Sequence, residues 1–246
     1  MSKKDNSYNK QIVSLKTSSP VAEAFRTLRT NIQFSSLDQD IKTILVTSPQ
    51  PKDGKSTVVA NLGVTKARSG GTVLLVDGDL RKPTLHKLFN ISNLVGLTNY
   101  IIEEDLHLQE VVQTTFLENL FVMTSGAIPP NPAELLGTRR MKETLQELRD
   151  TFDTVIIDSP PVVAVSDSSI ISSMSDATLL VLGHGDSNRE AALKAKEQLE
   201  LAQANFLGVV MNKVPLNGQG YYYYYYYGGY GQEDKKNKRS KKRRKK

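Results

Sequence analysis

The sequence predicts an α/β fold in which a parallel β-sheet is covered by helices on both faces. Short, continuous apolar runs recur along the chain, and stretches with helical periodicity separate many of them. Uninterrupted apolar strands are typical of parallel sheets that are buried on both faces. The chain has 246 residues, enough for one such domain, and its composition gives no sign of a second. We therefore expect a single domain over residues 18–213, preceded by an extended segment over residues 1–17.

The charge of the chain is concentrated at its end. Residues 232–246 carry ten Lys or Arg and two acidic residues, and the formal charge of +6 therefore leaves −2 for residues 1–231. A mildly acidic domain argues against a nucleic-acid-binding face in the fold. The absence of Cys excludes disulfides and thiolate metal sites, and no apolar run approaches the roughly 18 residues of a membrane span. We expect a soluble, cytoplasmic protein.

The first helix carries a charged stripe. Residues 12–15 are expected to lie extended along the surface. Ser19-Pro20 is expected to start a helix that runs from Val21 to about Phe34, because Pro is favoured at the first helical position. Charged residues at spacings of three lie near one another on such a helix. They form either a solvated face or a subunit contact: Glu23, Arg26 and Arg29.

Residues 43–57 hold a candidate phosphate-binding loop. The buried strand Thr43–Val46 runs through a turn into Gly54-Lys55-Ser56 and then into a helix. In such loops backbone N–H groups and a helix N-terminus attract phosphate, the Lys reaches the outer phosphates and the Ser coordinates Mg²⁺. The full pattern has a Gly where this chain has Pro49, so the first turn must differ, and a Lys-Ser pair at a surface helix end is the alternative. The expected nucleotide contacts are Pro51, Lys52, Asp53, Gly54, Lys55, Ser56 and Thr57.

Two further apolar strands end in carboxylates. The strand over residues 73–76 leads into Asp77-Gly78-Asp79-Leu80-Arg81, and the strand over residues 154–157 leads into Asp158. Ligands of open parallel sheets bind at the carboxyl ends of the strands. Carboxylates there suit Mg²⁺ ligation and acceptance of a proton, although polar strand-to-loop turns are the simpler alternative.

The remaining elements follow in order. Residues 83–118 indicate only short helices, and a strand is expected over residues 120–123. Helices are expected over residues 133–149, 167–174 and 188–204, and strands over residues 177–182 and 206–211. The last strand leads into Asn212, which we take as a contact for the nucleotide base.

Most of the tyrosines lie beyond the predicted domain. Residues 214–231 are expected to be a flexible cluster and residues 232–246 a basic disordered tail. The cluster is either an adhesive segment, a stacking surface for bases, or a set of phosphate acceptors. A Tyr phenol has a pKa of about 10, so an acceptor needs alignment and a carboxylate to take its proton. The eight candidates are Tyr221, Tyr222, Tyr223, Tyr224, Tyr225, Tyr226, Tyr227 and Tyr230.

Taken together, the phosphate loop, the Asp77–Arg81 motif, Asp158 and the tyrosine cluster resemble the bacterial tyrosine kinases of capsular and exopolysaccharide biosynthesis in Gram-positive bacteria. The resemblance covers about residues 12–231. It implies a P-loop NTPase-like fold and ATP-dependent autophosphorylation with Mg²⁺. It further implies that Lys55 binds the β- and γ-phosphates, that Ser56, Asp79 and Asp158 serve the metal, and that Asp77 is the base. Arg81 and Asn212 are assigned to the nucleotide.

The resemblance also implies partners. The motif Glu23-x-x-Arg26-x-x-Arg29 is similar to one that joins subunits into a ring. The activator of such kinases is a cytoplasmic segment of a membrane-bound polysaccharide co-polymerase, and a phosphatase opposes them. This places the chain at the inner face of the membrane, where it would regulate polysaccharide polymerisation and export. The lysine-rich end departs from the family pattern; one hypothesis is that phosphorylation moves it from an anionic membrane surface to its own phosphates.

Two other functions remain open. A partition or positioning ATPase shares the fold and the Asp-tipped strands, and acts as a nucleotide-gated dimer without tyrosine phosphorylation. Such proteins usually carry a signature Lys at the position of Gln50, and its absence, with the tyrosine cluster, favours the kinase. The second is a non-catalytic adaptor that uses the tail as an adhesive segment.

Overall fold

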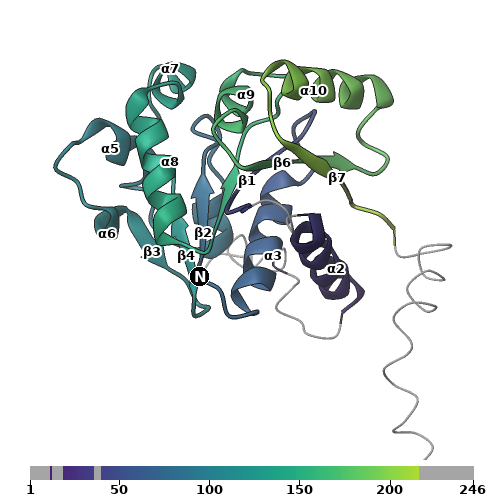
Figure 1. The fold of residues 1–246 in the computed structure, drawn as a ribbon, viewed down its shortest axis with the longest axis horizontal. Coiled ribbons are helices and arrows are strands. Elements are labelled where there is room, and N and C mark those ends of the chain that lie inside the picture. Colours follow the sequence, from purple (N-terminus) through teal and green to yellow (C-terminus); the bar gives the residue numbers. More distant parts are fainter. Residues whose placement is uncertain (1–11, 13–18, 36–39, 216–246) are drawn as a thin grey trace, which may run out of the picture. The chain divides into compact units, whose positions relative to one another are not determined.

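The computed structural model describes residues 12, 19–35 and 40–215. By internal contacts the chain divides into two units, Met1–Asn212 and Lys213–Lys246, and only residues 213–215 of the second are described. The first unit is the α/β domain that the sequence predicts (Figure 1). The tyrosine cluster, the basic tail and most of the N-terminal segment lie outside the described residues.

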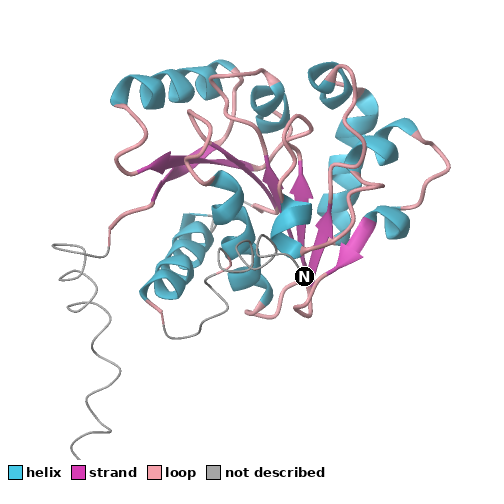
Figure 2. Cartoon of the chain, turned by 180° about the vertical axis from the view of Figure 1, so that it is seen from behind, coloured by secondary structure: helices cyan, strands magenta, loops and turns pink. Residues whose placement is uncertain are grey.

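One sheet forms the centre of the domain, with its strands in the order β3-β4-β2-β5-β1-β6-β7. The pairs within β4-β2-β5-β1-β6-β7 are parallel, whereas β3 pairs antiparallel with β4. Figure 2 shows the resulting sheet with helices on both of its faces. The strands are β1 (Thr43–Thr47), β2 (Val73–Asp77), β3 (Val112–Thr114), β4 (Leu120–Met123), β5 (Thr154–Asp158), β6 (Ala177–Gly183) and β7 (Phe206–Asn212).

Among the described residues, helix α2 precedes β1, and the other helices lie in the connections between strands. Labels follow Figure 1. They are α2 (Pro20–Ser35), α3 (Lys55–Ala67), α4 (Leu85–Phe89), α5 (Leu97–Ile102), α6 (Leu108–Val111), α7 (Pro132–Leu136), α8 (Arg139–Thr151), α9 (Asp167–Ser172) and α10 (Arg189–Leu201).

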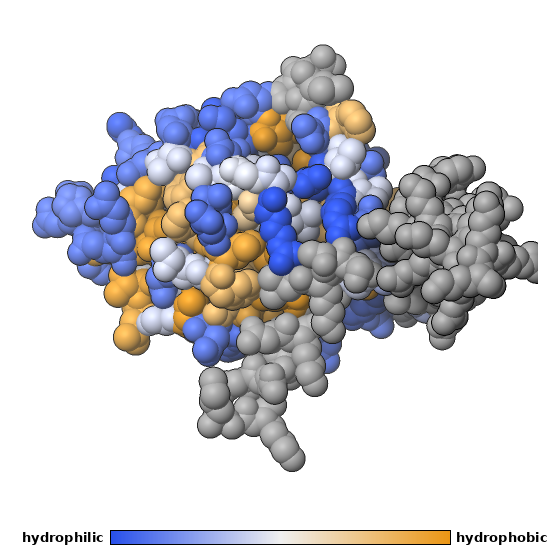
Figure 3. Space-filling model, turned by 90° about the horizontal axis from the view of Figure 1, so that it is seen from below, coloured by the Kyte–Doolittle hydropathy of each residue, from blue (hydrophilic) through white to orange (hydrophobic). Residues whose placement is uncertain are grey.

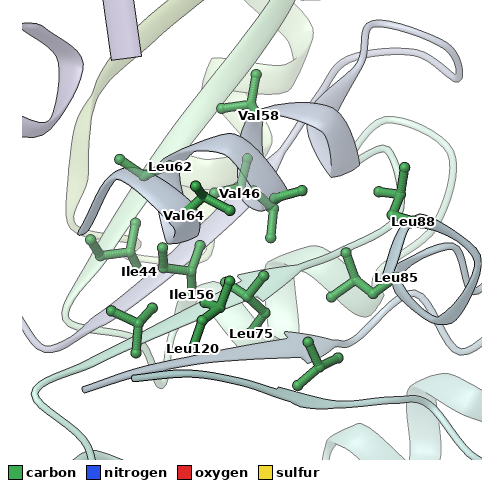
Figure 4. Packing of buried hydrophobic residues seen from close by; sticks show 14 of the residues in the cluster. Ile44, Val46, Val58, Leu62, Val64, Leu75, Leu85, Leu88, Leu120 and Ile156 are labelled. Carbon is green, nitrogen blue, oxygen red and sulfur yellow. The ribbon is translucent and has the colours of Figure 1, made fainter. Parts of the chain in front are cut away.

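Alternate residues of the central strands enter different cores. Ile44 and Val46 of β1 pack on the face covered by α2, α3 and α4, whereas Leu45 packs on the face covered by α5, α7 and α8. Figure 4 shows the first of these cores, in which Val58 and Leu62 of α3 lie over the strands. Because successive side chains of a strand point to opposite faces, burial on both sides requires the uninterrupted apolar runs seen in the sequence.

Three details differ from the sequence-based expectations. The short edge strand β3 was not predicted. Ile12 was expected on the surface, but it is buried in the core under α2 and α3. The single helix expected over residues 133–149 is two helices, because the chain becomes extended at Thr138 and the Thr138 hydroxyl caps α8 by accepting a hydrogen bond from Met141 N.

Candidate functional site

The loop between β1 and α3 lies at the carboxyl edge of the sheet and is held together by Asp53. The buried carboxylate of Asp53 accepts hydrogen bonds from Gln50 N at 3.2 Å and from the Ser187 hydroxyl at 2.7 Å. The Asn212 side chain donates to the backbone carbonyl of Asp53 at 2.9 Å. The loop is therefore fixed from the ends of β6 and β7, which lie far from it in the sequence.

Gly54 has a backbone conformation and a close neighbour that both disfavour a side chain. Its φ of +94° is left-handed, and a Cβ built on it would lie 2.1 Å from Asn212 Nδ2. It immediately precedes Lys55, the first residue of α3, and its carbonyl accepts a hydrogen bond from Val58 N at 3.0 Å. The first turn of α3 therefore starts directly at the loop. N–H groups at the start of a helix have no carbonyl of an earlier turn to bond to, and such donors are what an anion site at a helix N-terminus requires.

Lys55 lies between two carboxylates. Its ammonium nitrogen is 3.2 Å from Asp79 Oδ2 and 3.7 Å from Asp158 Oδ1. Burial lowers the pKa of Lys55, but Asp158 and Asp79 outweigh that effect and raise its pKa above the ordinary value. Burial raises the pKa of Asp158, and the charge of Lys55 opposes this rise. The arrangement concentrates one cation and two carboxylates beside the phosphate loop.

Asp77 lies at the end of β2, beside β5 and its terminal Asp158. Its Oδ2 accepts hydrogen bonds from the backbone N–H groups of Thr84 and Leu85, both at 2.9 Å, at the start of α4. Its Oδ1 is buried and has no hydrogen-bond partner among the described residues. Burial, together with the nearby charge of Asp158, raises the pKa of Asp77 to about 8 despite those two N–H groups.

Gly78 explains how Asp77 and Asp79 come so close to β5. The Gly78 N–H donates to the Asp158 carbonyl at 2.8 Å, and a Cβ at Gly78 would lie 2.8 Å from the same oxygen. Any side chain would separate the ends of β2 and β5. The Gly between the two carboxylates therefore allows all three acidic residues to share one site.

Arg81 does not point freely into this cluster. Its guanidinium forms two hydrogen bonds with the buried carboxylate of Asp167, at 2.9 and 3.0 Å. From the sequence we predicted that Arg81 contacts the nucleotide, and we predicted no role for Asp167. The structure places Asp167 at the start of α9, where it holds Arg81 and hence the loop after β2.

The donor set fits a hard divalent cation that also binds phosphate. Both carboxylate oxygens of Asp158 are buried without a hydrogen-bond partner among the described residues. Ser56 lies in the first turn of α3, next to Lys55. The described residues contain no group of three or more His, Cys, Asp or Glu that could hold a metal alone. Mg²⁺ commonly takes only one or two carboxylates and completes its shell with water and phosphate oxygens.

The other predicted site residues are distributed as follows. Pro51 and Lys52 are exposed at the tip of the loop, and Thr57 lies in the first turn of α3. On α2, Glu23 and Arg26 form an ion pair with each other, while Arg29 Nη1 lies 3.5 Å from the Thr65 carbonyl of α3. The eight candidate tyrosines lie outside the described residues.

Ser187 was not identified from the sequence. A lone Ser in a loop gives no signal that it will contact Asp53, 134 positions earlier. Gly183 N donates to the Ser187 hydroxyl at 2.9 Å, so the end of β6 positions this contact.

The chain is similar to known proteins in both sequence and fold. Residues 41–187 match the family described as AAA domain. The chain is 44% identical over 204 residues to tyrosine-protein kinase YwqD of Bacillus subtilis, covering 82% of this chain and 86% of YwqD. The solved structure of the chimerical protein CapA2B2 superposes with a TM-score of 0.79 at 40% identity, over 83% of this chain and 89% of that one.

A more distant likeness concerns the fold alone. The septum site-determining protein MinD of Pyrococcus horikoshii, solved with Mg-ADP, is 24% identical with a TM-score of 0.59, over 70% of each chain. In the part of the chain that the structure describes, no helix has both the length and the apolar character needed to cross a bilayer.

Proposed function

This chain belongs to the bacterial tyrosine-protein kinases, and we propose that it transfers the γ-phosphate of ATP to tyrosines between residues 221 and 230 of another copy of the same chain. One observation carries the assignment of roles: Lys55 lies between Asp79 and Asp158, with Asp77 on the adjacent strand end. A cation for phosphate, carboxylates for a metal and a further carboxylate for a proton are the groups that phosphoryl transfer to a hydroxyl requires.

Phosphate binding falls to the loop and the start of α3. Backbone N–H groups over residues 51–57 and the Lys55 ammonium group attract the β- and γ-phosphates. When ATP binds, its phosphates offer Lys55 a partner in addition to Asp79, with which it pairs at 3.2 Å in this structure. Asn212 holds the loop through the Asp53 carbonyl and lies at the side where we place the base.

Ser56, Asp79 and Asp158 are the residues that we assign to Mg²⁺. The bound ion would neutralise charge on the phosphates and so favour attack on the γ-phosphorus. The position of Asp158 supports this assignment, because its buried carboxylate lies 3.7 Å from Lys55 Nζ and close enough to Ser56 for the Ser56 side chain to lower its pKa.

Asp77 is the proposed base. In the transfer, the phenolic oxygen of the acceptor tyrosine forms a bond to the γ-phosphorus, the bond from that phosphorus to the β,γ-bridging oxygen breaks, ADP leaves, and the phenolic proton passes to Asp77. The raised pKa of Asp77 favours proton acceptance once the carboxylate is ionised. Its free Oδ1 is the atom that would take the proton, because Oδ2 is held by α4.

The proposal includes the cellular setting. The chain assembles into a ring through Glu23, Arg26 and Arg29 and phosphorylates between subunits. It is activated at the inner face of the cell membrane by the cytoplasmic segment of a polysaccharide co-polymerase and reversed by a tyrosine phosphatase. It thereby regulates the polymerisation and export of a capsular or extracellular polysaccharide. The similarity to the tyrosine-protein kinase YwqD supports the kinase activity on which this setting depends.

A direct test is to incubate the purified chain with Mg-ATP and the activator segment, and to analyse the C-terminal peptide by mass spectrometry. We expect phosphate on tyrosines between residues 221 and 230 and none with Lys55→Met. Unphosphorylated tyrosines in the active protein, or undiminished phosphate in the variant, would refute the assignment. A nucleotide-gated positioning ATPase would instead hydrolyse ATP and leave the tyrosines unmodified.

A further inference from the structure

Two loops at the carboxyl edge of the sheet, residues 91–96 and 124–131, are joined into one surface that we call the loop platform. The Asn93 side chain donates to the Gly126 carbonyl at 3.1 Å and accepts from Gly126 N at 3.2 Å and the Ser125 hydroxyl at 3.1 Å. The backbones also touch, since a Cβ on Gly96 would lie 2.1 Å from the Thr124 carbonyl oxygen. The platform is therefore built by specific contacts.

The platform presents aliphatic side chains to solvent. Leu94 is 84% exposed, Ile128 64% and Val95 38%. The sequence contains no charged residue from 88 to 102 or from 119 to 133. Single exposed aliphatic residues are ordinary, but several on one uncharged, hydrogen-bonded scaffold are typical of an interaction surface.

The platform lies beside the proposed catalytic groups. Asp77 binds the N–H of Leu85, and α4, which begins there, is five residues long, so it spans about 7.5 Å before the chain reaches residue 91. The second loop leaves β4, and β4 is the immediate neighbour of β2, which ends at Asp77. A peptide lying on the platform would flank the phosphoryl-transfer site.

An acidic segment follows the platform. Helix α5 leads from Gly96 to Glu103, Glu104 and Asp105, all of which are exposed. Ile102, just before them, is 59% exposed. In Figure 3 hydrophilic residues occupy the left edge, the side on which α5 and α6 lie in Figure 1. The exposed side chains are therefore aliphatic before α5, at Leu94 and Val95, and acidic after it, at Glu103–Asp105.

We propose that the loop platform docks the tyrosine segment of a second copy of this chain, residues 221–230, while the basic end of that segment, residues 235–246, lies along Glu103–Asp105. The inference rests on the proposed function and names the surface that selects its acceptor. The two partners carry complementary groups in the same order. Along the tail, aromatic residues are followed by basic ones, and along the surface, exposed aliphatic residues are followed by acidic ones. Residues 235–246 contain ten Lys or Arg and no acidic residue.

The lengths also match. Along the surface, the ten positions from Leu94 to Glu104 include α5 and span at most about 24 Å if the short ends beside the helix are extended. On the tail, eight positions separate Tyr227 from Lys235, and an extended chain covers about 26 Å over that distance. A tyrosine on the platform therefore leaves the lysines within reach of the acidic segment.

Sheet order decides which tyrosines of the same copy could reach the platform. The tail follows β7, and β7 is five strand spacings from β4, which is about 24 Å. Nine positions separate Asn212 from Tyr221, about 30–32 Å of fully extended chain, so the first tyrosines of the same copy reach the platform only when almost fully stretched. Tyr227 lies fifteen positions beyond Asn212 and could span about 50 Å, so it has no such restriction. We assign the tail to a second copy because the proposed function is transfer between copies, and an experiment that mixes two copies separates the two cases.

The same surface explains how a product would leave. Each phosphotyrosine carries a charge of about −1.5 to −2, so several phosphates would exceed the basic charge of the tail. A tail that has turned acidic is repelled by Glu103–Asp105. Binding of an unmodified tail and release of a modified one then follow from one charged segment.

The test in solution mixes two full-length copies. The acceptor copy carries Lys55→Met, and the donor copy carries Phe at all eight tail tyrosines, so that phosphate on the acceptor tail reports transfer between copies. We expect Leu94→Ser/Ile128→Ser in the donor to raise the KM for the acceptor about fivefold or more. The same pair in the acceptor should have no effect, and Leu193→Ser, an exposed aliphatic control on α10, should have none in the donor.

Loss of transfer only when the platform variant is in the acceptor copy would mean that a tail docks on its own copy, and would overturn the proposal. Equal transfer by donors with and without the variant would overturn it as well. Absence of transfer from the unaltered donor would instead refute the proposed function. Because docking could not be judged from transfer in that case, a second measurement tests docking without catalysis.

That measurement is the fluorescence anisotropy of a labelled peptide of residues 217–246 titrated with the full-length Lys55→Met protein. We expect weaker binding by about fivefold or more with Leu94→Ser/Ile128→Ser, and a similar loss with Glu103→Lys/Glu104→Lys. Removing residues 235–246 from the peptide should abolish the effect of the two lysine substitutions. A parallel titration uses vesicles containing anionic lipid in place of the protein. Equal binding to all protein variants, or binding to the vesicles without binding to the protein, would reject the platform as the docking site.

Discussion

The ammonium nitrogen of Lys55 lies 3.7 Å from Oδ1 of Asp158, and both oxygens of that buried carboxylate lack a hydrogen-bond partner among the described residues. A buried carboxylate in this state costs free energy of folding, and burial accordingly raises the pKa of Asp158. Such a group is expected where function, and not stability, requires the charge.

We predict that Asp158→Asn separates stability from activity. The amide removes one of three neighbouring carboxylates, and Lys55 keeps its partner Asp79 at 3.2 Å, so the free energy of unfolding of the protein without ligands should change little. Phosphoryl transfer should fall by about a hundredfold or more, because a metal ligand is lost. Thermal unfolding and transfer of labelled phosphate measure the two effects. A variant that unfolds more easily but transfers phosphate normally would contradict the role given to Asp158.

The pH dependence of the reaction should report Asp77. Its pKa is raised to about 8 in the folded protein, above an ordinary value of 3.8. As a base it must be ionised, so kcat/KM for the acceptor should rise as pH approaches about 8 and then level off. Asp77→Asn should be slow at all pH values and lack this rise. A rise that persists in Asp77→Asn would assign the titration to another group.

Stability should change with pH in the opposite direction. A raised folded pKa means that the folded state holds the proton of Asp77 more tightly than the unfolded state does. Its contribution to stability is complete below the unfolded value and is lost as pH rises toward about 8. Asp77→Asn should therefore flatten the decline in the free energy of unfolding between about pH 4 and pH 8, measured by denaturant titration.

Two glycines that flank α3 form a matched pair, Gly54 in the phosphate loop and Gly70 beyond the other end of the helix. Gly54 and Gly70 both have left-handed φ angles, +94° and +104°, but only at Gly54 would a Cβ meet another residue, Asn212. Gly70→Ala should cost about 1–2 kcal/mol of stability from the backbone alone. Gly54→Ala should cost more and also weaken ATP binding. Adding Asn212→Ala should restore part of the excess stability loss of Gly54→Ala, and an unchanged loss would show that the steric contact is not its cause.

The features predicted correctly from the sequence are those that depend only on a few consecutive residues. Strands β1, β2 and β5 are apolar on both faces, and each ends at a polar or acidic residue, so their position and the edge carrying Asp77, Asp79 and Asp158 follow from local pattern. The break between α7 and α8 is also local, at Gly137-Thr138, but helical periodicity on both sides concealed it.

The features missed depend on contacts between distant residues. Asp53 bonds to Ser187, which is 134 positions away, and its carbonyl to Asn212, which is 159 positions away. The guanidinium of Arg81 is taken by Asp167, 86 positions away. No local pattern of charge or polarity indicates these pairs, since they arise only when the ends of β6 and β7 and the start of α9 meet the active edge.

A third example lies at the opposite edge of the sheet and concerns stability. Asp176 accepts hydrogen bonds from the backbone N–H groups of Lys42 and Thr43 and from Arg149 Nε, at 2.8–3.3 Å. Although burial raises the pKa of Asp176, these donors outweigh it and leave the pKa lowered. Asp176→Ala should cost about 2 kcal/mol or more, because two N–H groups at the start of β1 lose their acceptor.

The lowered pKa of Asp176 fixes the direction of its pH dependence. Its stabilising contribution is present above the unfolded value of 3.8 and is lost as pH falls through the folded value. The difference in unfolding free energy between the natural chain and Asp176→Ala should thus shrink below about pH 4. Phosphoryl transfer at 25 °C should be unchanged in the variant, and a specific loss of transfer would show that the effect reaches the other edge of the sheet.

The charged stripe on α2 allows its two interpretations to be separated. Glu23 and Arg26 form an ion pair within the helix, which for an exposed pair is worth about 0.3–0.5 kcal/mol. Arg26→Glu should break this pair, and the exchange Glu23→Arg/Arg26→Glu should restore it with the charges reversed. Light scattering coupled to size-exclusion chromatography then measures the assembly.

If the stripe contacts a neighbouring subunit, as we propose, the exchanged variant should regain stability but remain unassembled. The surface of the neighbour that receives the stripe is unaltered, so it no longer matches the exchanged charges. Recovery of both would assign the stripe to a solvated helix face.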